Sequence, residues 1–201
     1  HIPLQQLTGE QGFMGLTFSV NEHVLIPRQD TEILVEEVLK ELHDGMRVLD
    51  MCTGSGCILL SLLHYSNDCE GLGVDLSAEA LEVAGRNVLK VLTPEKAEHA
   101  HFLQSDLFEK VEGKFEIIVS NPPYIASAEV EKLMPEVRDH EPRMALDGTE
   151  DGLYFYRRII EEAGKHLVSS GMLFFEIGYD QGQAVSELML SLIHISEPTR
   201  P

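Results

Sequence analysis

The residues most suited to chemistry in this sequence are Asn121, Pro122, Pro123 and Tyr124, which directly follow an apolar run at 115–120. Proline has no backbone N–H, so this loop presents acceptors, namely the side-chain oxygen of Asn121 and the carbonyl of Pro122. Two acceptors can hold both hydrogens of one planar NH2 group, and a tyrosine ring offers a face on which a planar group packs. We predict that Asn121, Pro122 and Tyr124 position an amide or amine nitrogen for reaction, and that Pro123 lines the same substrate pocket.

A glycine-containing turn at residues 50–56 is the second candidate site. Gly54 and Gly56 stand between an apolar run that ends in Asp50 and a second apolar run. Glycine lets the backbone approach a ligand closely, and a helix N-terminus favours polar or anionic groups. The dinucleotide fingerprint G-x-G-x-x-G is not met, because Leu59 stands where its third glycine belongs, and no P-loop lysine follows. The predicted cofactor-binding residues of this turn are Asp50, Cys52, Thr53, Gly54, Ser55 and Gly56.

Two later acidic residues complete a nucleoside site. Asp75 ends the next apolar run, where a carboxylate can accept hydrogen bonds from both ribose hydroxyls. Asp106 follows the third run, where it can accept a hydrogen bond from an adenine amino group while Leu107 packs on the ring. We predict that Asp75, Asp106 and Leu107 bind the cofactor and that Asn121 contacts it as well.

The elements that must position these residues alternate between strands and helices. Ser77 is the expected N-cap of one helix, because apolar residues recur at helical spacing after it. Strands are predicted at 46–50, 71–75, 101–104, 115–120 and 171–177, and helices at 57–64, 77–92 and 153–167. Strands that are buried on both faces and joined by helices form a parallel sheet with right-handed crossovers. We therefore predict a doubly wound, mostly parallel α/β fold of the Rossmann-like type, whose ligands bind at the carboxyl ends of the strands.

The flanking segments are interpreted separately. Residues 16–20 and 23–26 are predicted to form a β-hairpin around Asn21 and Glu22, and Asp30 is expected to cap a helix that runs to about residue 42. Residues 191–201 continue no periodic pattern and are interpreted as a non-native tail. The predicted organisation is a linker and hairpin at 1–29, a catalytic domain at 30–190 and this tail.

Composition narrows the class of protein. The net charge of -19 opposes binding to a phosphate backbone, so no stable nucleic-acid binding is expected. No apolar run is long enough to span a bilayer, and neither the three cysteines nor the nine histidines have metal-ligand spacing. We expect a cytoplasmic protein with reduced cysteines, without a metal site and without membrane association.

The chain resembles the protein-glutamine methyltransferases that modify peptide chain release factors (the HemK, or PrmC, family of class I S-adenosylmethionine-dependent methyltransferases). The resemblance covers roughly residues 3–189. It rests on LIPRQDTE at 25–32, the turn at 50–56, Asp75, NPPYI at 121–125, EPRMALDG at 141–148 and DGL at 151–153. The NPPY motif is shared with adenine methyltransferases. The segments at 25–32, 141–148 and 151–153 are therefore the ones that favour the glutamine methyltransferases.

The resemblance implies both a substrate and a cofactor. The substrate would be the glutamine of the Gly-Gly-Gln motif in bacterial-type release factors, with its amide held by residues 121–124. The cofactor would be S-adenosyl-L-methionine, bound by residues 52–56, Asp75, Leu107 and Asn121. Pro27 and Arg28 would line the entrance near both ligands, which makes Arg28 a substrate-binding candidate.

The chain departs from the family pattern at three places. Cys52 replaces a glycine that often begins the turn, the usual N-terminal helical domain is absent, and no final antiparallel hairpin follows. We therefore expect a chain truncated at both ends. The sequence indicates no dedicated proton acceptor: His140 and Glu141 lie in a polar loop and are expected to serve its structure.

Three alternatives remain open at this point. An adenine or guanine exocyclic-amine methyltransferase would use the same pocket on a base flipped out of DNA or RNA. A nicotinamide- or other nucleotide-binding domain would share the glycine turn, and a non-catalytic fragment could bind a release factor without binding the cofactor.

Overall fold

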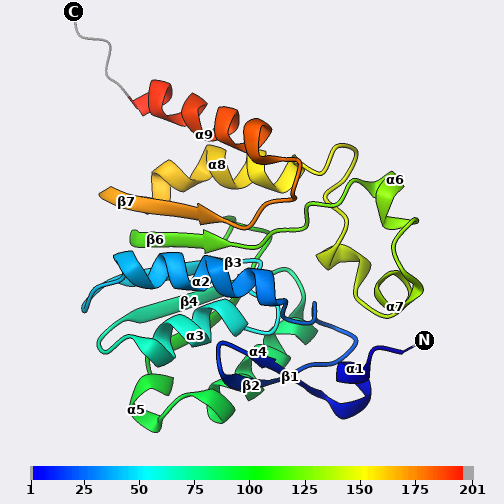
Figure 1. The fold of residues 1–201 in the computed structure, drawn as a ribbon. Coiled ribbons are helices and arrows are strands. Elements are labelled where there is room, and N and C mark those ends of the chain that lie inside the picture. The colour runs from blue at the N-terminus through cyan, green and yellow to red at the C-terminus, as the bar shows by residue number, and fades with distance from the viewer. Residues whose placement is uncertain (1, 197–201) are drawn as a thin grey trace, which may run out of the picture.

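Five parallel strands form the central sheet of the computed structural model, which describes residues 2–196, with side chains through residue 191. In chain order they are β3 (Arg47–Met51), β4 (Glu70–Asp75), β5 (Ala100–Gln104), β6 (Phe115–Ser120) and β7 (Leu167–Phe175). Their spatial order is β5-β4-β3-β6-β7, and every pairing is parallel (Figure 1). The predicted parallel α/β sheet is confirmed, and β7 is its last strand within the described residues.

The register of the sheet brings the strand ends to a common edge. Met51, the last residue of β3, pairs with Val74 of β4 and with Ser120 of β6. The chain passes outward from β3 to β4 and β5 and then returns to the other side of β3 as β6. Ligands bind at such a change of direction in open α/β sheets, because the loops after the strands diverge there.

Helices cover both faces of the sheet. The helices α2 (Gln29–Glu41), α3 (Cys57–Tyr65) and α4 (Ala78–Val91) pack on one face, and α8 (Tyr154–His166) packs on the other. Neighbouring residues of β3 show why its apolar run is continuous: Val48 lies in the first core cluster and Leu49 in the second, and neither is exposed. Helix α9 (Gly182–Ser196) packs outside α8 (Figure 1).

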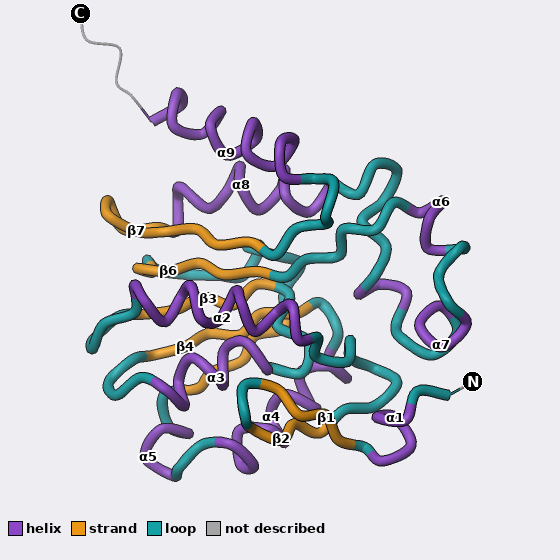
Figure 2. Tube along the Cα trace, in the orientation of Figure 1, coloured by secondary structure: helices purple, strands orange, loops and turns teal. Residues whose placement is uncertain are grey.

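The N-terminal hairpin exists, but its predicted partner strand was wrong. Strand β1 (Glu10–Phe13) pairs antiparallel with β2 (Leu16–Ser19), and the hairpin lies beside α4 (Figure 2). Met14 and Gly15 form the turn with positive φ values of 51° and 71°, the combination that a two-residue hairpin requires. Residues 23–26 form no strand. Apolar and polar residues alternate at 23–26 because Val24 and Ile26 are buried, and this alternation resembles that of a strand.

Most other predicted elements are confirmed with shifted ends. Ser77 caps α4, since its Oγ accepts a hydrogen bond from the Ala80 N–H at 3.0 Å. Arg28, and not Asp30, is the N-cap residue of α2, without a side-chain capping bond. β7 begins four residues before the predicted Gly171, at Leu167. The short helices are α1 (Leu4–Thr8), α5 (Pro94–Ala97), α6 (Ser127–Val130), α7 (Pro135–Arg138) and the 3-10 helix η1 (Arg143–Ala145).

The C-terminal segment is partly described. Residues 191–196, for which the sequence indicates no periodic pattern, form the end of α9, whereas residues 197–201 lie outside the described part of the chain. The boundaries of the predicted domain and tail stay predictions. None of the helices within residues 2–196 is long and apolar enough to cross a membrane.

Candidate functional site

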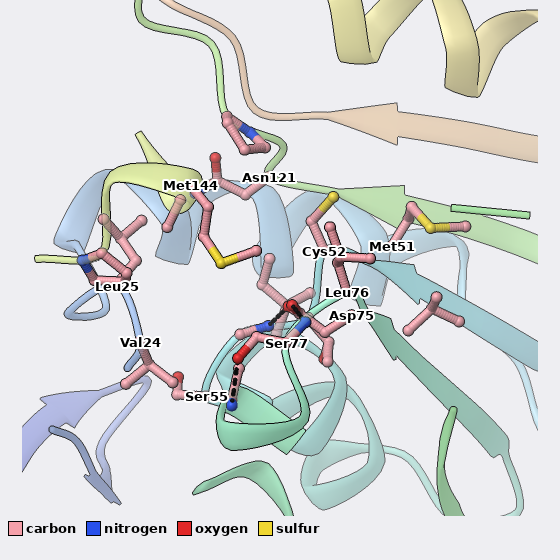
Figure 3. Close-up of a pocket in the computed structure, with 18 of the residues that line it drawn as sticks. Val24, Leu25, Met51, Cys52, Ser55, Asp75, Leu76, Ser77, Asn121 and Met144 are labelled. Carbon is pink, nitrogen blue, oxygen red and sulfur yellow. Dashed lines mark hydrogen bonds between the residues drawn. The ribbon is translucent and has the colours of Figure 1, made fainter. Parts of the chain in front are cut away.

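A cavity of about 300 Å³ opens at the carboxyl ends of the strands. Figure 3 shows Asn121 and Met144 on one side of it and Asp75, Ser77 and Ser55 on the other. The site residues predicted from the sequence that line this cavity are Arg28, Cys52, Thr53, Gly54, Ser55, Asp75, Asp106, Leu107, Asn121 and Pro123. The loops after four different strands therefore converge on one site, as the sequence predicted. Asp50, Gly56, Pro122 and Tyr124 do not line it.

The glycine turn is held by the strand beside it. Gly54 has a φ of 55°, and its N–H donates to Asp75 Oδ2 at 2.8 Å. The N–H of Thr53 donates to the Val74 carbonyl at 2.9 Å, which extends the pairing of β3 and β4 into the turn. No heavy atom lies within 4 Å of the position that a Cβ on Gly54 would occupy. The backbone is thus open toward a ligand at this residue.

Asp50 supports the turn from the protein interior. Its side chain is fully buried, and Oδ2 accepts hydrogen bonds from Thr53 Oγ1 at 2.6 Å and from the Leu59 N–H at 3.3 Å. Burial raises the pKa of Asp50 to about 7, against the lowering effect of these bonds. Gly56 also packs inward, because a Cβ there would lie 3.1 Å from Leu60 and 3.2 Å from Ala84. Asp50 and Gly56 therefore stabilise the turn that faces the cavity, and neither lines the cavity itself.

Cys52, where the family resemblance leads us to expect glycine, has an unusual backbone conformation. Its φ is 63°, a region that non-glycine residues rarely adopt. Burial raises the pKa of its thiol, and the charges of Asp75 and Asp50 raise it further. The thiol therefore lines the cavity in its neutral form, and the site has the negative potential that its carboxylates create.

Asp75 and Asp106 occupy the two predicted nucleoside-binding positions. Asp75 accepts from the Gly54 N–H through Oδ2 and from the Ser77 N–H through Oδ1 at 3.0 Å, while burial raises its pKa. Each carboxylate oxygen has a second lone pair, so both can still accept from ribose hydroxyls. Asp106 pairs with Arg158 of α8 at 2.8 Å through Oδ1, which leaves Oδ2 for a ligand. The sequence pattern did not indicate Arg158.

The loop at 121–124 is enclosed by the segment around residues 146–152. The Ile125 N–H donates to the Leu146 carbonyl at 3.0 Å, and the Gly148 N–H donates to the Ile125 carbonyl at 2.8 Å. A Cβ on Gly148 would lie 2.7 Å from the Tyr124 Cα, and one on Gly152 would lie 2.3 Å from the Tyr124 carbonyl oxygen. Gly148 and Gly152 therefore have to be glycine, because the backbone of their segment packs directly on the backbone of the loop at 121–124.

Asn121 is oriented by α2. Its Nδ2 donates to Thr31 Oγ1 at 3.3 Å, and Thr31 itself is buried at the cavity wall. Tyr124 lies behind the cavity, with its hydroxyl 3.4 Å from Glu176 Oε1. Burial and the charge of Glu176 raise the pKa of Tyr124 to about 12, so its hydroxyl keeps its proton.

Several functional neighbours were missed by the sequence analysis. Glu176 directly follows β7 and Asp75 is the last residue of β4, so a search for acids at the ends of apolar strands could have identified Glu176 as well. Gln181 donates to the Tyr124 carbonyl at 2.9 Å, and the fully buried Asn87 joins Ser19 of the hairpin to Ser55 of the turn. No local signal marks Gln181 or Asn87, because their partners are far away in the chain.

Comparisons with known proteins agree with this geometry. A family model described as methyltransferase small domain matches residues 28–137. The chain is 44% identical over 193 residues to the release factor glutamine methyltransferase of Thermodesulfovibrio yellowstonii, covering 94% of this chain and 68% of that protein. It is 45% identical over 203 aligned residues to the protein of the same name from Clostridium acetobutylicum, covering 99% and 70%.

Solved structures match the fold at lower identity. A methyltransferase from Pyrococcus furiosus superposes with a TM-score of 0.61 at 19% identity, covering 89% of this chain and 79% of that one. An E. cuniculi complex responsible for methylation of the eRF1 translation termination factor gives a TM-score of 0.59 at 20% identity, covering 89% and 87%. At these identities the two structures show a shared fold.

Proposed function

This chain belongs to the family of release factor glutamine methyltransferases, and from that premise we propose the reaction that its site performs. The chain is a methyltransferase, and its cofactor is S-adenosyl-L-methionine. The proposed acceptor is the side-chain amide nitrogen of the glutamine in the Gly-Gly-Gln motif of peptide chain release factors. The proposed partners are therefore release factors of the bacterial type.

The charges around the cavity fit this cofactor. S-adenosylmethionine, when bound, supplies an electrophilic methyl group on a positively charged sulfur. Asp75, Asp106 and Asp147 line the cavity with carboxylates, and Arg28 is the permanent cation among the lining residues, so the local potential is negative. Such a potential stabilises a cation and repels a diphosphate. The same observation disfavours the alternative of a nicotinamide dinucleotide.

The orientation of the Asn121 side chain is the observation that supports the proposed substrate. Because Nδ2 donates to Thr31, the side-chain Oδ1 is the atom of Asn121 left to accept a hydrogen bond from a substrate N–H. An amide nitrogen is a poor nucleophile because its lone pair is delocalised into the carbonyl. Acceptors that hold its hydrogens in a fixed direction orient the nitrogen and favour charge build-up on it, so positioning and electrostatics supply the rate enhancement.

We propose that Pro122 and Tyr124 also hold the substrate, although neither lines the cavity. Pro123 lies in the wall while Pro122 and Tyr124 do not. In our proposal the Pro122 carbonyl is the second acceptor and the Tyr124 ring packs on the amide plane once a substrate loop occupies the site. Arg28 lines the cavity on the side of the segment before α2 and contacts the entering substrate.

Methyl transfer from labelled S-adenosylmethionine tests the proposal directly. The acceptors are a purified unmodified release factor, the same factor with Gln→Ala in its Gly-Gly-Gln motif, and a DNA duplex, with a full-length curated relative as positive control. We expect label on the unmodified factor alone. Label on the duplex would support the exocyclic-amine alternative, and label on none of the three with an active control would support the non-catalytic alternative.

A further inference from the structure

Gln181 does not line the cavity, but its side chain reaches the loop at 121–124. It lies between β7 and α9, and the chain after β7 leaves the sheet at the same edge as the chain after the parallel strand β6 (Figure 1). The Gln181 Nε2 donates to the Tyr124 carbonyl at 2.9 Å and to the Gly152 carbonyl at 3.3 Å. One side-chain amide therefore joins the loop at 121–124 to the segment around residues 146–152.

The orientation of the Gln181 amide follows from its neighbours. Its Oε1 accepts from the Gly178 N–H at 3.0 Å, and its backbone N–H donates to the Gly178 carbonyl at 3.0 Å. A backbone N–H can only donate and a carbonyl can only accept, so Oε1 must face the Gly178 N–H and Nε2 must face the other two carbonyls. A Cβ on Gly178 would lie 2.9 Å from Oε1, and one on Gly152 would lie 2.7 Å from Nε2. Both ends of the amide are therefore closely packed as well as hydrogen-bonded.

The contact with Tyr124 holds the peptide group that ends the loop. The Tyr124 carbonyl and the Ile125 N–H belong to one planar peptide group. The Ile125 N–H donates to the Leu146 carbonyl at 3.0 Å, and the Tyr124 carbonyl accepts from Gln181. Within the described part of the chain, no other group donates a hydrogen bond to the Tyr124 carbonyl. Loss of the Gln181 donor would therefore release one side of this peptide group.

The other end of the loop is held by the sheet. The Glu176 N–H donates to the Ser120 carbonyl at 3.0 Å, and Ser120 Oγ donates to the Met51 carbonyl at 2.6 Å. Between the two ends, the rings of Pro122 and Pro123 restrict φ to about −65°, and neither residue has a backbone N–H to donate. The direction of the Pro122 carbonyl therefore depends on how the two ends of the loop are held.

We propose that Gln181 is a positioning residue: by holding the peptide group between Tyr124 and Ile125, it directs the Pro122 carbonyl and the Tyr124 ring at the substrate NH2 group. Without its donor the end of the loop relaxes, and the second acceptor moves out of line with the substrate nitrogen. A displacement of about 1 Å at such a group can reduce a rate about 100-fold. This inference deepens the proposed glutamine methylation and rests on it.

Two variants test the assignment through kinetics. Gln181→Glu keeps the shape but places a carboxylate oxygen against two carbonyl oxygens, and Gln181→Met keeps the length but has no donor. Gln183→Glu is the matched control, because Gln183 is exposed on α9 and donates to Glu187. With an unmodified release factor as substrate, we expect kcat to fall about 10- to 100-fold in both Gln181 variants and to stay within about twofold in the control.

Cofactor binding should be unaffected by the same changes. The glycine turn is held by Val74 and Asp75 of β4, and Gln181 contacts neither of them. The Kd for S-adenosylmethionine should therefore stay within about twofold of the wild-type value in all three variants, as measured by calorimetry.

A purely structural role of Gln181 predicts a different result. Gln181→Met would then lower the melting temperature, but kcat measured well below that temperature would equal the wild-type value for each molecule that binds S-adenosylmethionine. A kcat within about twofold of the wild type on this basis would overturn the proposal.

A readout without substrate separates this inference from the proposed function. Hydrogen exchange of backbone amides reports local opening. The Ile125 and Gly148 N–H groups bond the end of the loop to its neighbouring segment, and in Gln181→Met both should exchange at least about tenfold faster than in the wild type. The Thr53 N–H, which bonds to Val74 in the glycine turn, should exchange at the wild-type rate.

The outcomes distinguish the two proposals. If the wild type fails to methylate a release factor but the local change in exchange occurs, the substrate proposal fails and the positioning of the loop by Gln181 stands. Unchanged exchange at Ile125 would contradict the role of Gln181 whatever the substrate. Equal acceleration at Ile125 and Thr53 would contradict it too, because that result indicates a general loss of stability.

Discussion

Arg28 and Glu141 form an ion pair that joins the segment before α2 to the loop after α7, although 113 positions separate them in the sequence. The Glu141 side chain is 1% exposed and that of Arg28 is 40% exposed. Glu141 Oε2 also accepts from the Ile26 N–H at 3.1 Å. Because Arg28 and Pro142 line the cavity from the two segments, Glu141 ties two walls of the site together.

Replacement of Glu141 should therefore loosen both walls. In Glu141→Ala, Arg28 and the Ile26 N–H lose their acceptor, and we expect the free energy of unfolding to fall by about 1–3 kcal/mol. The Kd for S-adenosylmethionine should rise. Urea denaturation and calorimetry measure the two effects. Glu37→Ala, which removes an exposed partner of Lys40, serves as the control and should change neither quantity.

Gly148 should tolerate no side chain. A Cβ there meets backbone atoms, namely the Tyr124 Cα at 2.7 Å and the Pro123 carbonyl oxygen at 2.9 Å. Gly148→Ala must therefore displace the loop at 121–124. We expect a lower melting temperature and a turnover reduced more than about tenfold. Gly164→Ala in α8 is the matched control, since its Cβ meets nothing within 4 Å. That change should stabilise the protein by up to about 1 kcal/mol. Similar behaviour of the two variants would contradict the packing argument.

Asn121→Ala should separate catalysis from cofactor binding. Loss of the Oδ1 acceptor removes the orientation of the substrate nitrogen, and we expect turnover to fall by about two to three orders of magnitude. The Kd for S-adenosylmethionine should change by a few-fold at most, because the glycine turn and Asp75 remain. Initial rates and calorimetry on the same preparation measure both. Near-normal turnover would show that the amide clamp is wrong.

Asp75 should bind the ribose as well as the turn. We expect Asp75→Asn to raise the Kd for S-adenosylmethionine about tenfold or more, because charge-assisted hydrogen bonds become neutral ones. Analogues that lack one ribose hydroxyl should bind the wild type more weakly but should lose less affinity in Asp75→Asn. Asp68→Asn at an exposed position is the control. Equal losses in Asp75→Asn and wild type would show that Asp75 serves only the turn.

Asp50 should make stability depend on pH. Its pKa is raised from 3.8 to about 7 in the folded protein, so the folded state binds more protons than the unfolded state between these values. Its contribution to the free energy of unfolding therefore decreases as the pH rises through this window. Urea denaturation at about pH 5 and about pH 8 should show Asp50→Asn gaining about 2–3 kcal/mol relative to wild type at the higher pH. A difference that is independent of pH would mean that Asp50 stays charged when folded.

Local patterns predicted most of the fold, and most of the site residues that they indicated line the cavity. The apolar runs of β3, β4 and β6 were visible because both faces of a parallel strand are buried, and the cap at Ser77 depends on residues within one turn of the helix. The position of Asp75 at a strand end followed in the same way. The pairing of β1 with β2 was not predicted, because the turn between them contains Met14 at positive φ. Methionine does not favour that conformation, so the sequence does not indicate a turn there.

The contacts that orient the reactive groups have no local signal. The sequence by itself determined the chemical groups of this protein, the strands that carry them and the edge at which they emerge, because these depend on residue type and on periodicity over a few positions. Only the tertiary structure decided that Thr31 meets Asn121, that Glu176 meets Tyr124 and that Glu141 reaches Arg28. The physical reason is that the strand order β5-β4-β3-β6-β7 brings these residues together across long stretches of chain, and local pattern does not determine that order.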